Sequence, residues 1–255
     1  SATNSEGFET LNVGGTTEGS IKVNSVIHKN KWVMTNVPGF SEVGFLHAHQ
    51  DYLDKLEFHL IQTYNGEEVR GITNWESATK ALIANQEFGL PIDVERIDNL
   101  SATVDKISGN DQSQIDAAKH IYAYIRDNFI CQPDNDLYIE KNLYDVNKQK
   151  RGNVADINML LIAMLRRRNM DATPVILSTR EYGIHPVVYP VLGKMNYVIC
   201  RLRLGGILYF LDATNPHLAF GKLALNCYNG HGRVISNTDG ADVYFNADSI
   251  KESSV

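Results

Sequence analysis

The sequence predicts an α+β fold in which helices come first and a mainly antiparallel sheet follows. Residues 153–168 carry apolar side chains at helical spacing, a pattern typical of a buried helix. Apolar segments typical of strands follow at 173–178 and 196–212, and Gly205-Gly206 favours a hairpin within the second segment. A series of helices followed by a mainly antiparallel sheet indicates the α+β class.

Three further helices are expected upstream of this core. Asn74 can cap a helix that runs to about residue 88, and residues 101–107 form a short one. A longer amphipathic helix is expected from Asp111, with Gln114 at the capping-box position. Residues 131–149 are rich in Asp, Asn and Lys and are interpreted as a polar connection.

The pattern divides the chain into four parts. Residues 1–20 are rich in Gly, Thr, Ser and Glu, so we expect a flexible tail or an edge strand. Residues 21–70 are β-rich, with strand-like patterns at 21–27 and 55–60 and a Pro38-Gly39 turn between them. The main domain is expected over residues 71–236, and residues 237–255 are expected to form a C-terminal strand and tail.

The composition excludes several classes of function. An apolar content of 43% and a charged content of 21% are ordinary for a globular protein with a core. A formal charge of -6 with no basic stripe argues against a nucleic-acid partner. No apolar run is long enough for a transmembrane segment. The one dense basic cluster, Arg166-Arg167-Arg168, is interpreted as a solvated helix end.

Three short segments carry a family resemblance. They are Gly152-Asn153-Val154 at the start of the buried helix, Asn196-Tyr197-Val198, and Leu211-Asp212-Ala213-Thr214. The three segments resemble the Gly-x-Cys, Asn-His-Val and Leu-Asp-Pro-Thr motifs of transglutaminase-like domains, which belong to the papain-like cysteine protease superfamily. Residues 31–40 are similar to the end of the β-sandwich domain that often precedes this module in bacterial envelope proteins. The similarity covers about residues 21–236.

The resemblance implies a site that has lost its reactive groups. Active relatives use a Cys at the start of the central helix, a His that acts as base, and an Asp that orients the His. Here the three positions hold Val154, Tyr197 and Asp212, so only the acid remains. Losing the nucleophile or the base of such a triad lowers the rate by roughly 10⁴- to 10⁶-fold. We therefore expect no intact catalytic set.

Four other polar residues are candidates for the cleft around these positions. Asn153 and Asp156 lie at the start of the helix, where Asp156 is expected to cap or charge the first turn or to line the cleft. Asp212 is expected to hydrogen-bond Tyr197 or nearby backbone, and Asn196, which precedes Tyr197, could do the same. His217 follows Asp212 closely enough to reach the cleft, although a turn is the simpler interpretation.

The cysteine and histidine spacings do not favour a metal site or a cofactor. Cys131, Cys200 and Cys227 are too few and too scattered for a disulfide framework or a zinc site, and we interpret them as reduced and structural. His47 and His49, with Asp51 nearby, have the spacing of a metal pair on one face of a strand, but no fourth ligand is apparent nearby. Residues 134–136 are rich in oxygen ligands, but the Gly and Glu of a calcium loop are absent.

Two functions from different classes remain open. The first is a catalytically inactive module that binds a peptide, protein or glycan, or organises a longer parent chain with other domains. The second is an active cysteine peptidase or transglutaminase that acts on peptide or glutamine amide bonds through a thiol elsewhere in the chain. The resemblance implies a bacterial protein of the periplasm or cell envelope.

Overall fold

A computed structural model describes residues 2–13, 21–33, 35–36, 48, 51–53, 63–65, 68–70 and 72–249. The chain separates into two compact units, Ser1–Gly44 and Phe45–Val255, and each is described by itself. The patterns expected at 55–60 and at Pro38-Gly39 lie outside the described residues, as do His47 and His49.

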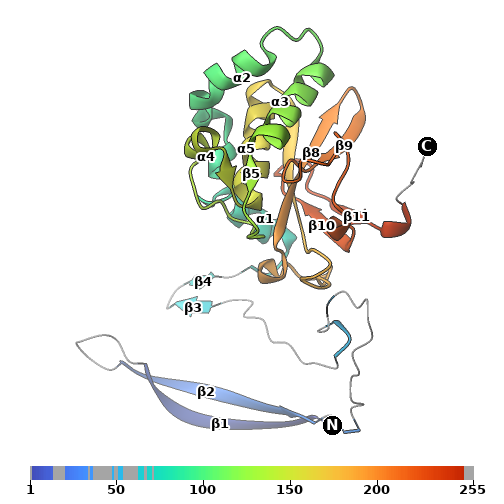
Figure 1. The fold of residues 1–255 in the computed structure, drawn as a ribbon. Coiled ribbons are helices and arrows are strands. Elements are labelled where there is room, and N and C mark those ends of the chain that lie inside the picture. The colour runs from blue at the N-terminus through green and yellow to red at the C-terminus, as the bar shows by residue number, and fades with distance from the viewer. Residues whose placement is uncertain are drawn as a thin grey trace. The chain divides into compact units, whose positions relative to one another are not determined.

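The first unit contains one long antiparallel pair. Strand β1 (Ala2–Val13) pairs with β2 (Ile21–Trp32), from Ala2 opposite Trp32 to Val13 opposite Ile21 (Figure 1). The strand predicted at 21–27 is therefore confirmed. The flexible tail expected at 1–20 is wrong for residues 2–13, where the edge-strand alternative holds. The polar composition of residues 2–13 does not prevent them from pairing, because the hydrogen bonds between paired strands come from the backbone.

The second unit begins with short strands and then becomes helical. Its first described strands, β3 (Thr63–Asn65) and β4 (Glu68–Arg70), pair antiparallel. The helical part comprises α1 (Trp75–Ile83), three 3₁₀ turns at Leu90–Ile92, Val94–Arg96 and Asp98–Leu100, α2 (Ser101–Ser108), α3 (Gln114–Asn128) and α4 (Leu143–Gln149). Two short parallel strands, β5 (Ile130–Cys131) and β6 (Arg151–Gly152), flank α4 and lead into α5 (Val154–Arg167).

Side-chain caps explain where α1 and α3 begin. Asn74 caps α1 as predicted, since its side chain accepts a hydrogen bond of 2.8 Å from the Ser77 N–H. The cap of α3 is Ser113 and not the expected Asp111, because the Ser113 hydroxyl accepts from the N–H three residues on. Each helix therefore starts where a side-chain oxygen can satisfy a free N–H group of the first turn.

Helix α4 lies inside the segment that was interpreted as a polar connection, so that expectation is wrong over 143–149. Asn142 caps the helix by accepting 2.9 Å from the Asp145 N–H. Leu143 and Val146 are its two buried residues. One apolar pair is too short a pattern to be detected as helical periodicity in the sequence.

A five-stranded antiparallel sheet follows α5, with the strand order β11-β10-β7-β8-β9. The strands are β7 (Asp171–Leu177), β8 (Tyr197–Leu204), β9 (Ile207–Leu211), β10 (Gly230–Val234) and β11 (Asp242–Phe245). The predicted hairpin is confirmed, since Gly205 and Gly206 join β8 to β9 with φ of +56° and +80°. Positive φ at both positions is the geometry that two-residue hairpin turns require.

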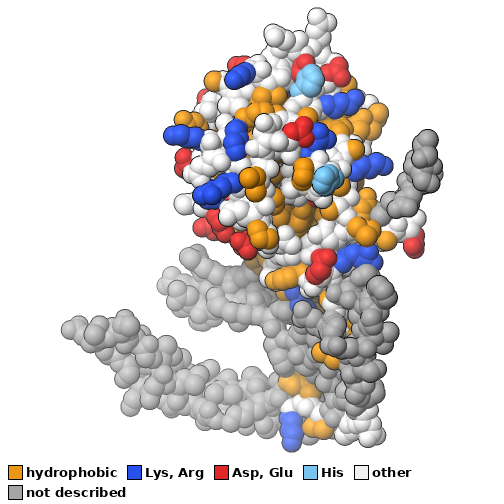
Figure 2. Space-filling view, in the orientation of Figure 1, with side chains coloured by type: hydrophobic (Ala, Val, Ile, Leu, Met, Phe, Trp, Pro, Cys, Tyr) orange, Lys and Arg blue, Asp and Glu red, His pale blue; other side chains and the backbone are white. Residues whose placement is uncertain are grey.

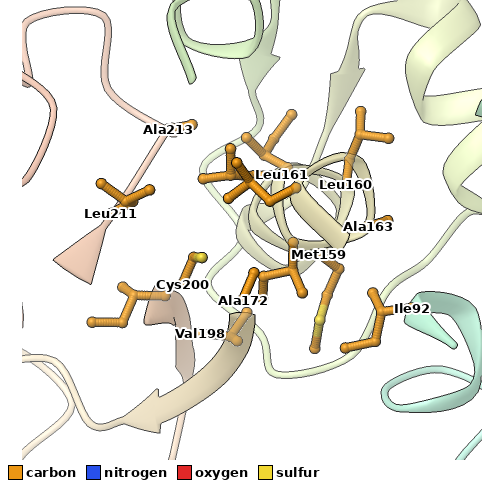
Figure 3. Close-up of a cluster of buried hydrophobic side chains, with 14 of the residues drawn as sticks. Ile92, Met159, Leu160, Leu161, Ala163, Ala172, Val198, Cys200, Leu211 and Ala213 are labelled. Carbon is orange, nitrogen blue, oxygen red and sulfur yellow. The ribbon is translucent and has the colours of Figure 1, made fainter. Parts of the chain in front are cut away.

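The core is built around α5. Every residue of this helix from Val154 to Leu165 is buried, which agrees with a helix that is packed on all sides. The helix packs on β7 and β8, and Figure 3 shows Val198 and Cys200 of β8 beside it, with Ile92 and Leu211 on different sides. The predicted buried helix and the α+β fold class are both confirmed.

The basic cluster at the end of α5 differs from its prediction. Arg166, Arg167 and Arg168 are partly buried rather than solvated. Arg167 donates to the Ser101 hydroxyl at 2.6 Å, and Arg166 donates to two backbone carbonyls. The surrounding 3₁₀ turns and α2 cover this helix end, which the basic composition of the cluster did not indicate.

The visible face of the second unit carries charged side chains of both signs. Figure 2 shows lysine and arginine interspersed with acidic and apolar side chains. Among the described residues, no helix is both long and apolar enough to cross a membrane.

Candidate functional site

Asp212 is the centre of a buried polar cluster directly after β9. Its side chain has no exposed surface. Its carboxylate accepts hydrogen bonds from the Tyr197 hydroxyl at 3.0 Å, the Asn158 amide at 3.0 Å, and both the N–H and the hydroxyl of Thr214 at 3.1 and 2.8 Å. A buried carboxylate needs such donors because its desolvation is otherwise costly.

Tyr197, the first residue of β8, supplies the donor that reaches the second oxygen of Asp212. Its hydroxyl also lies 2.9 Å from the Thr214 hydroxyl. Burial and the nearby Asp212 carboxylate raise the pKa of Tyr197 above its ordinary value. The hydroxyl is therefore neutral at physiological pH, and it acts as a hydrogen-bond donor rather than as a base. The expected contact between Tyr197 and Asp212 is confirmed.

Asn158 joins this cluster to α5, and sequence reasoning missed it. Its amide donates to Asp212 and to the Val198 carbonyl at 2.9 Å, and its oxygen accepts 3.0 Å from the Ala213 N–H. Asn158 follows Val154 by four residues, so both lie on one face of the helix. The available signal was a single amide within an otherwise apolar buried stripe.

Val154 is the first residue of α5 and is only 2% exposed. Its N–H lies 3.4 Å from the Asp134 carbonyl. Asn158 lies one turn after Val154 on the same helix face, and its side chain binds the Asp212 carboxylate there. The resemblance also implies that the side chains of Val154 and Tyr197 lie in or near contact, and this stays a prediction.

Asn153 and Asp156 form the N-terminal cap of α5. The Asn153 side chain accepts 2.7 Å from the Asp156 N–H, and Asp156 accepts 3.0 Å from the Asn153 N–H, a reciprocal capping box. The other Asp156 oxygen accepts from the N–H groups of Glu140 and Lys141. The prediction that Asp156 caps the first turn is confirmed. Its carboxylate is occupied by backbone donors.

Asn196 and His217 contact other groups. The Asn196 side chain accepts 2.9 Å from the Thr179 N–H and donates to the Thr179 hydroxyl, so it holds the β7–β8 loop rather than Asp212. His217 is exposed, and its backbone N–H donates to Asn215. The expectation that Asn196 could bond nearby backbone is therefore confirmed, and its amide is paired across the loop.

Cys131 lies closer to the start of α5 than the sequence indicated. It stands opposite Gly152 in the parallel pair of β5 and β6. Burial, with contributions from the Asp212 and Asp156 carboxylates, raises the pKa of its thiol to about 12. The thiol donates 3.4 Å to the Gln132 carbonyl. An unforeseen strand pairing therefore brings a thiol near the cluster, but in its protonated form.

The other two thiols are buried and protonated as well. Burial raises the pKa of Cys200 to about 12 and that of Cys227 well above its ordinary value. All three cysteines are free, as expected. Within the described part of the chain, no hydrogen bond joins a cysteine to a histidine.

Two further residues of the cluster were not predicted. Thr214 lies two positions after Asp212, a spacing typical of a side chain that closes a local turn. The Tyr122 hydroxyl on α3 donates to the Asp212 and Leu218 carbonyls, both at 3.0 Å. Tyr122 thereby links the segment after β9 to the helical layer, a contact between distant segments that no local pattern indicates.

Comparison with known proteins identifies the fold. Residues 101–199 match the model of the transglutaminase-like superfamily. The chain superimposes with a TM-score of 0.53 and 13% identity on a candidate protease from Parabacteroides distasonis, over 96% of this chain and 42% of that one. A candidate cysteine protease from Cytophaga hutchinsonii gives a TM-score of 0.37 and 16% identity, over 62% and 54% of the two chains. Comparison with curated proteins gives no match.

The likeness to the Parabacteroides protein shows the fold alone, because 13% identity says little about chemistry. The chain spans less than half of the Parabacteroides protein.

Proposed function

Because residues 101–199 form a transglutaminase-like domain, we propose that this domain is catalytically inactive and serves as a binding or structural module. The observation that carries the proposal is the cluster around Asp212, in which Tyr197 occupies the carboxylate that would otherwise orient a histidine. The activity that we propose the domain lacks is thiol-dependent acyl transfer.

The first support is the absence of a nucleophilic atom at position 154. The N-terminus of α5 carries the positive end of a helix dipole, which lowers the pKa of a thiol placed there. Val154 occupies this place with an apolar side chain that is 2% exposed. Acyl transfer requires an atom that attacks a carbonyl carbon and then holds the acyl group, and valine has none.

The second support is the absence of a base at position 197. Tyr197 has a raised pKa, keeps its proton and donates a hydrogen bond to Asp212. The hydroxyl would have to lose that proton beside a buried carboxylate before it could accept another. Two negative charges at hydrogen-bond distance in a buried site oppose that ionisation.

The module's ligand, in this proposal, is a peptide, a protein or a glycan, and its parent is a longer cell-envelope or periplasmic protein with other domains. The resemblance to bacterial envelope proteins supports the location. The 42% coverage of the Parabacteroides protein agrees with a module that combines with further segments.

The alternative is an active cysteine peptidase or transglutaminase, and one observation favours it. Cys131 lies opposite Gly152, two residues before Val154, so a thiol is present near the start of α5. Its raised pKa weighs against the alternative, because the thiolate is the reactive form.

Turnover assays separate the two functions. The protein is incubated with casein and with a glutamine-donor substrate plus an amine acceptor, with and without prior treatment with iodoacetamide. We expect no iodoacetamide-sensitive release of peptides and no incorporation of the amine. Turnover that iodoacetamide abolishes, and that Cys131→Ala also abolishes while Cys227→Ala does not, would establish the alternative.

A further inference from the structure

A cavity lies at the opposite end of α5 from Val154. It has a volume of about 770 Å³ and is enclosed by the end of α1 and the segment after it, the end of α5 with the start of β7, and the loop after β10. This volume falls within the range of small-molecule sites. Arg166, in its lining, follows Val154 by twelve residues, which is about 18 Å along a helix. The cavity is therefore separate from the Asp212 cluster.

Part of the cavity wall is apolar and well packed. Phe88, Ile92, Met170 and Ile235 contribute to the lining, and each is at most 5% exposed. Such a wall suits an apolar group of a ligand, because moving apolar surface out of water lowers the free energy.

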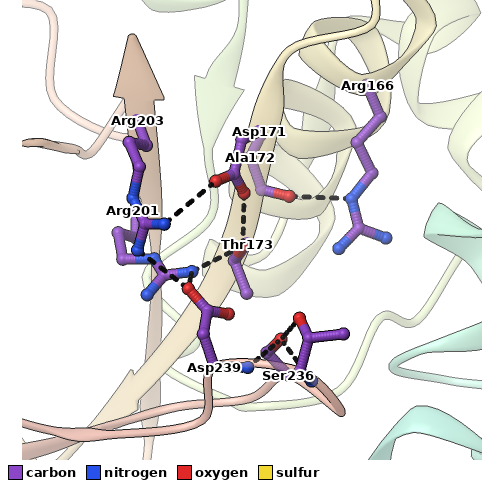
Figure 4. Close-up of polar contacts among 9 residues, drawn as sticks. Arg166, Asp171, Ala172, Thr173, Arg201, Arg203, Ser236 and Asp239 are labelled. Atoms are coloured by element: carbon purple, nitrogen blue, oxygen red, sulfur yellow. Dashed lines mark hydrogen bonds and ion pairs between the residues drawn. The ribbon is translucent and has the colours of Figure 1, made fainter. Parts of the chain in front are cut away.

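The acidic groups of the lining already have cationic partners. Asp239 accepts from Arg201 at 2.7 Å and from Arg203 at 2.8 Å, and Asp171 lies 3.8 Å from Arg203 (Figure 4). The buried Nε of Arg201 has no hydrogen-bond partner. This layer therefore contains more cationic donors than carboxylate acceptors.

Arg166 is the cationic residue of the cavity lining that has no carboxylate partner among the described residues. Its Nε donates 2.8 Å to the Ala172 carbonyl and its Nη1 donates 2.9 Å to the Ile92 carbonyl. It forms no ion pair with any residue that the structure describes. Its Nη2 makes no hydrogen bond to any of these residues either. Figure 4 shows its side chain extending from α5 to the Ala172 carbonyl.

The electrostatics of Arg166 agree with this geometry. Burial lowers the pKa of its guanidinium, while Cys200 and the more distant Asp93 and Asp171 act in the opposite direction. The negative end of the α5 dipole offsets part of the charge. Carbonyl dipoles and distant carboxylates compensate a guanidinium less well than a paired anion does.

We propose that this cavity binds an apolar molecule that carries a single carboxylate, with Arg166 as the counter-charge. The apolar part lies against the wall formed by Phe88, Ile92, Met170 and Ile235, and the carboxylate accepts from the unused donors of Arg166. A dianion such as phosphate fits less well, because Asp171 and Asp239 also line the cavity and repel a second negative charge.

The chemistry allows two sources, a small free acid or the C-terminus of a peptide. Calorimetric titrations on the unchanged protein distinguish them with two matched pairs of probes. The first pair is 4-methylpentanoate and 4-methylpentanamide, and the second is acetyl-Ala-Ala-Leu as free acid and as C-terminal amide. Within the pair that binds, we expect the acid to bind at least about tenfold more tightly than the amide, the usual effect of one charged hydrogen bond.

A substitution locates the binding. Arg166→Gln should abolish the preference for the acid. Arg167→Gln, a change on the same helix end outside the cavity, should leave it intact, because Arg167 bonds Ser101 and lies 3.7 Å from Asp98. The acid–amide comparison needs no variant, so it decides the question even if Arg166→Gln does not fold. Equal affinities of acid and amide, tighter binding of inorganic phosphate, or no binding of either acid would overturn the proposal.

Discussion

Asp212 has four hydrogen-bond donors around two oxygens, and at the scale of single residues this arrangement decides the character of the site. Among the residues that the structure describes, Tyr197 is the one donor to Oδ2. A tyrosine in this place retains its proton, whereas a histidine there would exchange one near neutral pH. In the inactive domain that we propose, Tyr197 therefore supplies a fixed hydrogen bond where a histidine would supply a proton relay.

Replacing Tyr197 with Phe tests the strength of that bond. The change leaves Oδ2 of a fully buried carboxylate without a donor, so the free energy of unfolding should fall by about 1–3 kcal/mol. Urea denaturation at neutral pH measures it. Tyr209→Phe is the control, because this half-buried residue of β9 has no hydroxyl hydrogen bond within the described structure, and it should change stability by less than about 0.5 kcal/mol. Equal losses in the two variants would contradict the role of the bond.

The sequence identified Tyr197 and Asp212 as partners but not the rest of their cluster. Their positions on successive strands follow from the hairpin, which Gly205-Gly206 indicates locally. Asn158, Thr214 and Tyr122 come from a helix, a turn and a second helix, and their contacts depend on packing between distant segments. Local periodicity carries no information about such contacts.

At the scale of elements, the start of α5 is fixed by the segment that precedes it. Gly152 pairs with Cys131, Asn153 and Asp156 cap the helix, and Asp156 also binds the backbone at Glu140. A Cβ at Gly152 would lie 2.4 Å from the Asp156 Cβ and 2.7 Å from its Oδ2. Only glycine permits this approach without displacing the carboxylate.

Gly152→Ala should therefore destabilise the fold by about 1–3 kcal/mol, the usual effect of overpacking in a buried site. Gly193→Ala is the matched control, since no atom lies within 4 Å of a Cβ built there. Thermal or urea unfolding of both variants gives the comparison. Two equally small shifts would show that the segment before α5 can relax, and that the cap is less rigid than the contacts indicate.

Predictability differs between elements for a physical reason. Helix α5 was predicted within about one residue, because its long apolar run is a strong pattern. Helix α4 and strands β5 and β6 are short, and tertiary contacts rather than propensity form them. The position of Cys131 was missed for the same reason, since it depends on the β5–β6 pairing.

At the scale of the whole molecule, buried thiols link stability to alkaline pH. Cys200 is fully buried, and burial raises its pKa from 9.0 to about 12. The unfolded chain releases this proton near pH 9, whereas the folded chain retains it until about pH 12. The stabilising contribution of the protonated Cys200 thiol to the free energy of unfolding is therefore fully present below pH 9. It is lost as the pH rises toward 12.

The free energy of unfolding should accordingly fall between pH 9 and 10, with Cys200 contributing up to about 1.4 kcal/mol per pH unit. Urea denaturation at several pH values measures the slope. In Cys200→Ala the slope should be smaller by that amount, whatever the variant's stability at neutral pH. Identical slopes in the two proteins would mean that the Cys200 thiol ionises equally well in the folded chain.

The central claim is that no thiol of this domain is activated for acyl transfer, and covalent labelling tests it most directly. The native protein is incubated at neutral pH with a peptide chloroacetamide, and the adduct is located by mass spectrometry. Denatured protein serves as the control in which Cys131, Cys200 and Cys227 should all react. The account predicts that the native thiols react more slowly than the same thiols in the denatured chain. Rapid, single-site labelling of native Cys131 would contradict it.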